Sequence, residues 1–218
     1  MPDWLKNGFV RLLDPVVAAL VRRPVHPNLI SSVGFLVTLA AAAIIFARYL
    51  VPGLAVFVLG GMMDILDGRV ARQTGLASKF GSFYDSTLDR VSEIVIYFSI
   101  YAYFRPLDEF WYAGYIVISA MVGSLMVSYT RAKAESLGVD CKVGMMQRPE
   151  RIVLLAAGGI LVPVVGAIAP EWRYAPLLVT IGAIAVLANF TALERIYEVY
   201  RVARGVPLDA APSTRKEG

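Results

Sequence analysis

Four aspartates stand in two pairs within one short stretch of this 218-residue chain, and their spacing is suited to metal binding. Asp64 and Asp67 are three residues apart, and Asp85 and Asp89 are four residues apart. On a helix, residues at these spacings project from one face, about one turn apart. Two such faces opposed to each other would form a cage of carboxylate oxygens, which are the ligands that Mg²⁺ and Mn²⁺ prefer. Because four carboxylates without counter-charge would repel one another, the sequence predicts a divalent-metal site.

The spacing of the whole stretch is D-x2-D-G-x2-A-R-x8-G-x3-D-x3-D. It resembles the signature of the CDP-alcohol phosphotransferases, membrane enzymes that move a phosphoalcohol or phosphatidyl group from a CDP-linked donor and release CMP. The alternative is a set of acids on a solvated helix face, which apolar runs on both sides of the stretch disfavour. The matching positions are Asp64, Asp67, Gly68, Ala71, Arg72, Gly81, Asp85 and Asp89.

The resemblance implies roles for these residues and for others nearby. The four aspartates would hold two Mg²⁺ or Mn²⁺ ions, and a pair of ions ~3.5–4 Å apart can bridge a diphosphate during an in-line displacement. Asp89, the last aspartate, would be the general base, a metal ligand, or both. Gly68 has helix packing as its alternative role, and Arg72 an ion pair with an aspartate. The residues expected to bind the CDP-linked donor are Pro27, Asn28, Leu29, Ile30, Gly68, Arg72 and Ser78.

A second set of cations points to the acceptor. Lys133, Arg151 and Arg195 match the pattern of the phosphatidylinositol-phosphate synthase branch, in which a basic pocket receives the phosphate of inositol phosphate. The chain has Gln147 where relatives often have an acidic residue before the R-P-E-R element. The alternative is that these cations contact lipid headgroups at the membrane surface.

The elements that would position these residues are membrane helices. Hydrophobic residues make up 57% of the chain, against ~45–50% in a soluble domain, so we expect an all-α integral membrane fold. An amphipathic interfacial helix at 3–23 precedes six predicted transmembrane helices, and residues 1–204 form a single membrane domain followed by a disordered tail at 205–218. The predicted spans are about 29–49, 54–73, 81–104, 110–136, 151–168 and 172–200.

Basic residues predict the orientation of these spans. Of the 21 Lys and Arg, only Arg48, Arg105 and Arg173 fall on one predicted side, and the other 18 fall on the opposite side. By the positive-inside rule, both termini and the aspartates face the cytoplasm of a multi-pass protein in the cell membrane. The single Cys141 excludes an internal disulfide.

The leading hypothesis is therefore an enzyme of phospholipid biosynthesis. It would transfer the phosphatidyl group of CDP-diacylglycerol to inositol phosphate, giving phosphatidylinositol phosphate and CMP. Glycerol phosphate is the alternative acceptor, which would make the chain a phosphatidylglycerol phosphate synthase. A divalent-cation or proton transporter is the alternative from another class, but the acids cluster at one membrane level. The expected partners are the CDP-linked donor, a phosphorylated polyol, membrane lipid and a second copy in a homodimer, with no nucleic acid.

Overall fold

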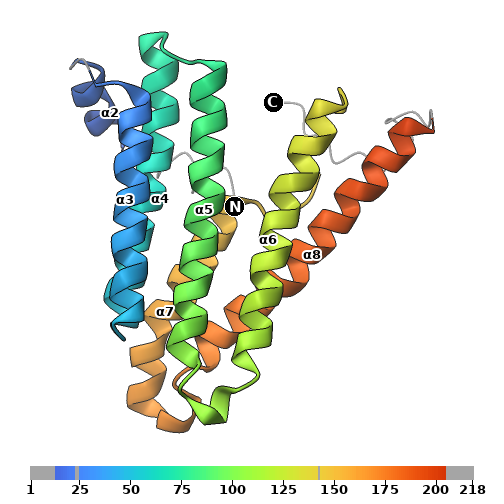
Figure 1. The fold of residues 1–218 in the computed structure, drawn as a ribbon. Coiled ribbons are helices and arrows are strands. Elements are labelled where there is room, and N and C mark those ends of the chain that lie inside the picture. Colours follow the sequence, from blue (N-terminus) through green and yellow to red (C-terminus); the bar gives the residue numbers. More distant parts are fainter. Residues whose placement is uncertain (1–12, 23–24, 142, 205–218) are drawn as a thin grey trace.

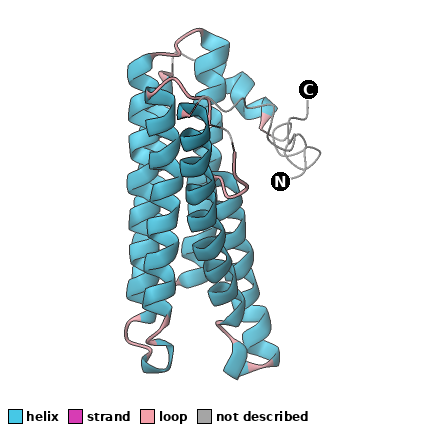
Figure 2. Cartoon of the chain, turned by 90° about the vertical axis from the view of Figure 1, so that its right-hand side faces the viewer, coloured by secondary structure: helices cyan, strands magenta, loops and turns pink. Residues whose placement is uncertain are grey.

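The computed structural model describes residues 13–22, 25–141 and 143–204, and within these ranges the chain is helical and contains no strand. Figure 2 shows long helices joined by short loops into an elongated bundle. Short 3₁₀ turns at Asp108–Phe110 and Pro170–Trp172 follow two of the long helices. The α-helices are α2 Asp14–Val21, α3 Pro27–Phe46, α4 Leu50–Thr74, α5 Lys79–Phe104, α6 Ala113–Ser136, α7 Arg148–Ile168 and α8 Ala175–Ala203.

The helices form two groups, which are joined by α7 and by the packing of α5 against α6. Helix α3 packs against both α4 and α5, while α6 packs against α8, and α7 contacts α4 and α8. Figure 1 shows α6 and α8 diverging from α3, α4 and α5 toward the end at which α2 lies. The buried core lies between these helices and includes Ile45, Ile100, Leu177 and Ile181. The two groups therefore separate at one end of the bundle, where the site residues are found.

A close contact between α3 and α4 sets the height of the first aspartate pair. A Cβ atom added to Gly60 would lie 2.5 Å from Thr38 Oγ1 and 3.3 Å from the carbonyl oxygen of Gly34. Only a residue without a side chain fits there, as is common where membrane helices approach closely. Gly60 precedes Asp64 by one helical turn, so this contact holds the Asp64 backbone beside α3.

The boundaries predicted for the six long helices agree with the structure, and no end differs by more than four residues. Within the described residues, five segments are long and apolar enough to cross a membrane. They are α3, α4, α6, α7 and the segment Pro170–Ala203 that contains α8. Helix α5 is long enough but is not among them, because its first half carries Asp85, Asp89, Arg90 and Glu93. The structure therefore supports a multi-pass membrane protein with five candidate spans and a sixth helix that is polar along half its length.

The predicted interfacial helix lies only partly in the described residues. Its second half is α2, which begins at Asp14 with Pro15 in the first turn, where proline is well tolerated. Leu13 and Val17 are buried against α4, and Asp14 forms an ion pair with Arg69 of α4. The rest of the predicted helix, at 3–12, and the predicted disordered tail at 205–218 lie outside the described residues.

Candidate active site

The two aspartate pairs face each other across α4 and α5. Carboxylate oxygens of Asp64, Asp67 and Asp85 all lie within 4.8 Å of one another. Asp89, one turn further along α5, lines the same small cavity. Three carboxylates that converge from two helices match the all-oxygen ligand set of a hard divalent cation. The residues present therefore fit a bound Mg²⁺ or Mn²⁺.

Helix α3 contributes a contact that sequence reasoning missed. Ser31 donates a hydrogen bond of 2.5 Å from its hydroxyl to Oδ2 of Asp67, which is only 4% exposed. This bond fixes the orientation of a buried carboxylate and leaves its other oxygen available to the cluster. The one signal in the sequence was the position of Ser31, which directly follows the Pro27–Ile30 segment predicted to bind the donor.

Arg148 is a second residue that the sequence analysis did not assign to the site. Its Nη1 lies 2.6 Å from Asp64 Oδ2 and 2.7 Å from Asp89 Oδ1, so one guanidinium joins a carboxylate of α4 to one of α5. The fifth span was predicted to begin at residue 151, but α7 begins at Arg148. The helix starts earlier because Gln147 is extended and Pro149 occupies the first turn, where its fixed φ favours helix initiation.

One cavity, of about 220 Å³, adjoins Asp67 and Asp85 and contains most of the predicted donor contacts. Its lining includes Pro27, Asn28, Gly68, Arg72 and Ser78. The other two predicted residues point elsewhere: Leu29 is 57% exposed, and Ile30 is buried in a hydrophobic cluster with Leu66 and Val70. Successive residues of a helix with 3.6 residues per turn cannot all face one cavity.

The turn from α4 to α5 shapes this donor-side cavity. Gly75 ends α4 in the left-handed conformation with φ 70°. Ser78 then caps α5, because its hydroxyl accepts a hydrogen bond of 3.0 Å from the Gly81 backbone N–H. A Cβ atom on Gly81 would lie 3.1 Å from both Asn28 Oδ1 and Ser78 Oγ, so the glycine keeps this corner of the cavity open. The turn thus aligns α5 so that Asp85 faces Asp67.

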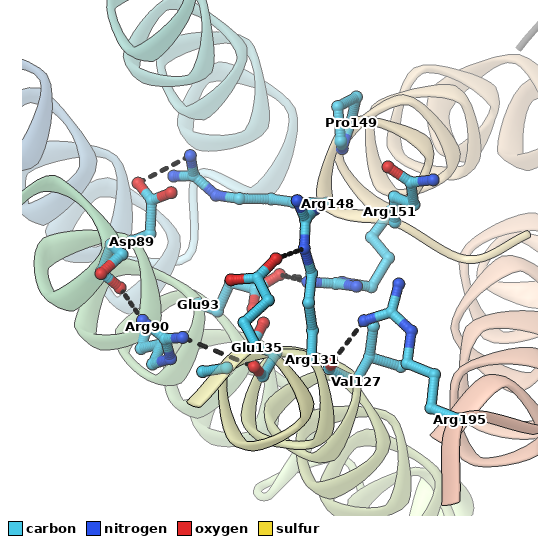
Figure 3. A pocket seen from close by; sticks show the side chains of 14 residues that line it. Asp89, Arg90, Glu93, Val127, Arg131, Glu135, Arg148, Pro149, Arg151 and Arg195 are labelled. Atoms are coloured by element: carbon cyan, nitrogen blue, oxygen red, sulfur yellow. Dashed lines mark hydrogen bonds and ion pairs between the residues drawn. The ribbon is translucent and has the colours of Figure 1, made fainter. Parts of the chain in front are cut away.

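The second cavity, of about 240 Å³, lies on the other side of Asp89 between α5, α6, α7 and α8 (Figure 3). Arg151 and Arg195, two of the three cations predicted to bind the acceptor, line it. Lys133 is exposed and is not among the lining residues. Arg131 lines the cavity from the same helix, and a residue two positions away points to nearly the opposite side of that helix. The charged side chains of the lining are Asp89, Arg90, Glu93, Arg131, Glu135, Arg148, Arg151 and Arg195.

Besides Arg148, two arginines of this acceptor-side cavity are held by acidic partners. Arg151 Nε and Nη2 lie 2.8 and 2.5 Å from Glu93 Oε1, and Arg151 Nη1 donates to the Met146 carbonyl at 3.0 Å. Arg131 Nε donates to Glu135 Oε1 at 2.9 Å. The charge of each is therefore balanced by a glutamate. Glu93 is a further residue that sequence reasoning missed, because its partner is 58 positions away.

Arg195 is held differently. It is only 2% exposed, and its Nε and Nη1 donate to the carbonyl oxygens of Val143 at 2.9 Å and Val127 at 2.6 Å. These neutral partners orient the guanidinium without cancelling its charge. Its position in the lining makes Arg195 a strong attractor for an anion in this cavity.

The loop between α6 and α7 supplies two of these carbonyls. Val143 and Met146 belong to it, and so does Cys141, which is 1% exposed. Burial raises the pKa of the Cys141 thiol above its usual value. A packed loop thus holds both Arg151 and Arg195 in place.

Comparison with known proteins identifies the family. The model of the CDP-alcohol phosphatidyltransferase family matches residues 24–191. The chain therefore belongs to this family and is a CMP-releasing transferase of phospholipid synthesis.

Individual relatives match along nearly their whole length. The chain is 34% identical over 192 residues to the archaetidylinositol phosphate synthase of Methanothermobacter thermautotrophicus, covering 88% of this chain and 90% of that protein. It is 32% identical over 206 residues to the phosphatidylinositol phosphate synthase of Cutibacterium acnes, covering 92% and 98%.

Solved structures agree with the fold. The crystal structure of Mycobacterium tuberculosis phosphatidylinositol phosphate synthase with CDP-DAG bound superposes with a TM-score of 0.73 at 25% identity, covering 87% of this chain and 94% of that one. A structure of the same enzyme with manganese and citrate gives a TM-score of 0.71, also at 25% identity, covering 85% and 88%.

Proposed function

We propose that this enzyme transfers the phosphatidyl group of CDP-diacylglycerol to inositol phosphate, giving phosphatidylinositol phosphate and CMP. The observation that carries the proposal is the placement of the carboxylate cluster between two cavities, one with the donor residues and one lined by arginines. The names of the two relatives, both inositol phosphate lipid synthases, favour inositol phosphate over glycerol phosphate.

The donor side positions the diphosphate of the CDP-linked lipid. Asp64, Asp67 and Asp85, with Asp89, would hold two Mg²⁺ or Mn²⁺ ions, which when bound supply charge neutralisation of the diphosphate and of the departing CMP oxygen. A manganese complex of the M. tuberculosis enzyme supports the use of a divalent metal. Gly68 leaves space beside the α4 backbone for the nucleotide, and Arg72 offers a charge-assisted contact to phosphate.

Asp89 would act as the general base. It lines both the carboxylate cavity and the acceptor-side cavity, so it lies where an acceptor hydroxyl meets the donor phosphorus. A new bond would form from that hydroxyl oxygen to the phosphatidyl phosphorus, and the bond from this phosphorus to the oxygen of CMP would break. The hydroxyl proton would pass to the Asp89 carboxylate.

The acceptor side would bind the phosphate of inositol phosphate. Arg195 supplies a buried guanidinium that contacts carbonyl oxygens and no acidic side chain, and Arg151 is oriented in the same cavity by Glu93. Lys133 is exposed and does not line the cavity. We therefore propose that its charge attracts the anion toward the cavity without contacting it directly in this conformation.

The distribution of basic residues supports a topology in which α5 also crosses the membrane, which brings the number of spans to six. Both termini and the site would then face the cytoplasm of a multi-pass protein in the cell membrane. We also propose that residues 1–204 act as one membrane domain, that membrane lipid surrounds it, and that the protein forms a homodimer, as the family resemblance implies.

One assay tests the reaction and the acceptor together. Purified protein is incubated with CDP-diacylglycerol, Mn²⁺ or Mg²⁺ and either inositol phosphate, glycerol phosphate or inositol, and CMP and the lipid product are measured. Parallel reactions with CDP-archaeol distinguish an ester-lipid from an ether-lipid donor. We expect metal-dependent CMP release that is fastest with inositol phosphate. Faster release with glycerol phosphate would overturn the acceptor assignment, and no release with inositol phosphate would contradict the proposed reaction.

A further inference from the structure

The small cavity lined by the four aspartates is called the carboxylate cavity here. Among the residues of α7, Arg148 lines both this cavity and the acceptor-side cavity. It starts at the first residue of α7, and its side chain is 17% exposed. Figure 3 shows it extended from α7 past the acceptor-side cavity toward Asp89. The residue therefore reaches the aspartates from the side at which the acceptor would bind.

Its contacts are those of a cation in a metal site. The single atom Nη1 lies 2.6 Å from a carboxylate oxygen of Asp64 and 2.7 Å from one of Asp89. A hard metal ion bridging α4 and α5 would use oxygens of the same two residues. Arg148 Nε and Nη1 are buried, and neither has a well-directed hydrogen bond among the described residues, so the guanidinium is held by the ion pairs of Nη1 with Asp64 and Asp89.

The position of the Arg148 guanidinium depends on the net charge of the carboxylate cluster. Four carboxylates with one arginine leave a large net negative charge, which attracts the guanidinium strongly in a partly buried site. Divalent cations on the same carboxylates would cancel that attraction and repel Arg148. The acceptor-side cavity, which Arg148 already lines, is the adjoining space into which its guanidinium can turn.

We propose that Arg148 is a built-in counter-ion that stands in for a divalent cation between Asp64 and Asp89, and that metal uptake frees its guanidinium to bind the acceptor's phosphate. This inference rests on the proposed metal and acceptor sites. It adds a coupling between metal binding and acceptor binding that neither site implies alone. Because such coupling is reciprocal, metal would tighten acceptor binding and the acceptor would tighten metal binding.

The first test measures Mn²⁺ binding to the protein without substrates, by titration with detection of free Mn²⁺ by electron paramagnetic resonance. Arg148→Gln removes the competing charge, so we expect Mn²⁺ to bind at least about tenfold more tightly. Arg148→Lys keeps the charge and should stay close to wild type. Arg131→Gln is the matched control, because Arg131 lines the same acceptor-side cavity but pairs with Glu135 and not with the aspartates. Its Mn²⁺ affinity should also stay close to wild type.

A second test uses the wild-type protein, so it does not depend on a variant that folds. Phenylglyoxal modifies accessible guanidinium groups, and mass spectrometry reports the extent at Arg148. We expect Arg148 to be protected without metal, to react several-fold faster with Mn²⁺, and to be protected again when Mn²⁺ and inositol phosphate are both present. Inorganic phosphate in place of inositol phosphate shows whether the phosphate group alone suffices.

The outcomes separate this inference from the proposed reaction. Unchanged or weaker Mn²⁺ binding in Arg148→Gln, or Mn²⁺-independent modification of Arg148, would overturn the counter-ion role even if wild-type protein releases CMP with inositol phosphate. Tighter Mn²⁺ binding in Arg148→Gln together with a strongly raised KM for the acceptor, and an unchanged KM for the donor, would establish it. A structural role alone would lower kcat and stability without tightening metal binding.

Discussion

The two cavities beside the carboxylate cluster are nearly equal in volume but opposite in charge. The donor-side cavity measures about 220 Å³, and Arg72 is the single cation among its described lining residues, together with Asp67 and Asp85. The acceptor-side cavity measures about 240 Å³ and is lined by five arginines and three acids. Under the proposed function, the donor's diphosphate would depend on bound metal for counter-charge, whereas arginine side chains would bind the acceptor's phosphate. This difference predicts which variants affect which substrate.

The largest effect is expected from the shared aspartates. Asp85→Asn removes a ligand charge with almost no change in volume, and metal coordination contributes several kcal/mol to such a reaction, so CMP release should fall at least about 100-fold. The matched control is Asp108→Asn, the same change at an exposed site at the opposite end of the bundle. Asp108→Asn should keep wild-type activity. Activity of Asp85→Asn within several-fold of wild type would contradict the metal site.

The next effect separates the two cavities. Arg195→Gln removes a charge-assisted contact worth ~1.5–3 kcal/mol, which is a rise in the acceptor KM of roughly 10- to 150-fold. The donor KM should barely change. Steady-state CMP release with each substrate varied in turn measures both constants.

Lys133→Gln is the comparison for Arg195→Gln. Because Lys133 is exposed and outside the cavity lining, its loss should change the acceptor KM only slightly, as for other exposed charges. If Lys133→Gln raised the acceptor KM as much as Arg195→Gln, this cavity would not be where the acceptor phosphate binds in the described conformation.

A smaller effect tests the donor-side cavity. A Cβ atom on Gly68 would lie 3.5 Å from Arg72 Nη1, an ordinary contact, so Gly68→Ala should fit the folded protein. Replacing a helical glycine with alanine should raise the free energy of unfolding by up to about 1 kcal/mol. We nevertheless expect a several-fold higher KM for CDP-diacylglycerol, since the added methyl group occupies space in the donor-side cavity. Thermal melts and initial rates measure the two effects, and an unchanged donor KM would assign Gly68 to helix packing alone.

The smallest effect concerns the loop that holds the acceptor-side arginines. Thiol labelling requires the thiolate, and burial both shields Cys141 and raises its pKa, so native protein should label slowly at neutral pH. The exposed Ser136→Cys in a Cys141→Ser background should label rapidly. Arg195→Gln should speed labelling of Cys141, because the Val143 carbonyl loses its partner. Fast labelling of Cys141 in the wild-type protein would show that the loop is not packed as described.

How far the sequence predicts this site depends on how local each contact is. Asp64 and Asp67 share one helix, and the short hydrophobic run before them indicates that the pair lies at or just inside the membrane interface, so spacing alone indicates a paired carboxylate face. Ser31 and Arg148 reach those aspartates from other helices, 36 residues before Asp67 and 84 after Asp64. No local period reveals such contacts. Their discovery requires the packing of α3 and α7 against α4.

The direction in which each side chain points from its helix explains the other differences between the predicted and the observed site. Leu29 and Ile30 follow Asn28 directly in the sequence, but the helical rotation turns Leu29 outward and Ile30 into a hydrophobic cluster. The resemblance to the phosphatidylinositol-phosphate synthases placed Lys133 with Arg151 and Arg195, but Arg131, and not Lys133, lies on the cavity side of α6. Helix α5 is long enough to cross a membrane, but the charged residues in its first half lower its mean hydropathy below that of the five candidate spans.

The most direct test of the two-cavity account is an experimental structure with Mn²⁺, CDP and inositol phosphate bound together. We predict CDP in the cavity lined by Gly68, Arg72 and Ser78, and the inositol phosphate in the cavity lined by Arg195, with metal density between Asp67 and Asp89. Inositol phosphate bound on the Gly68 side, or CDP beside Arg195, would contradict the assignment of the two cavities.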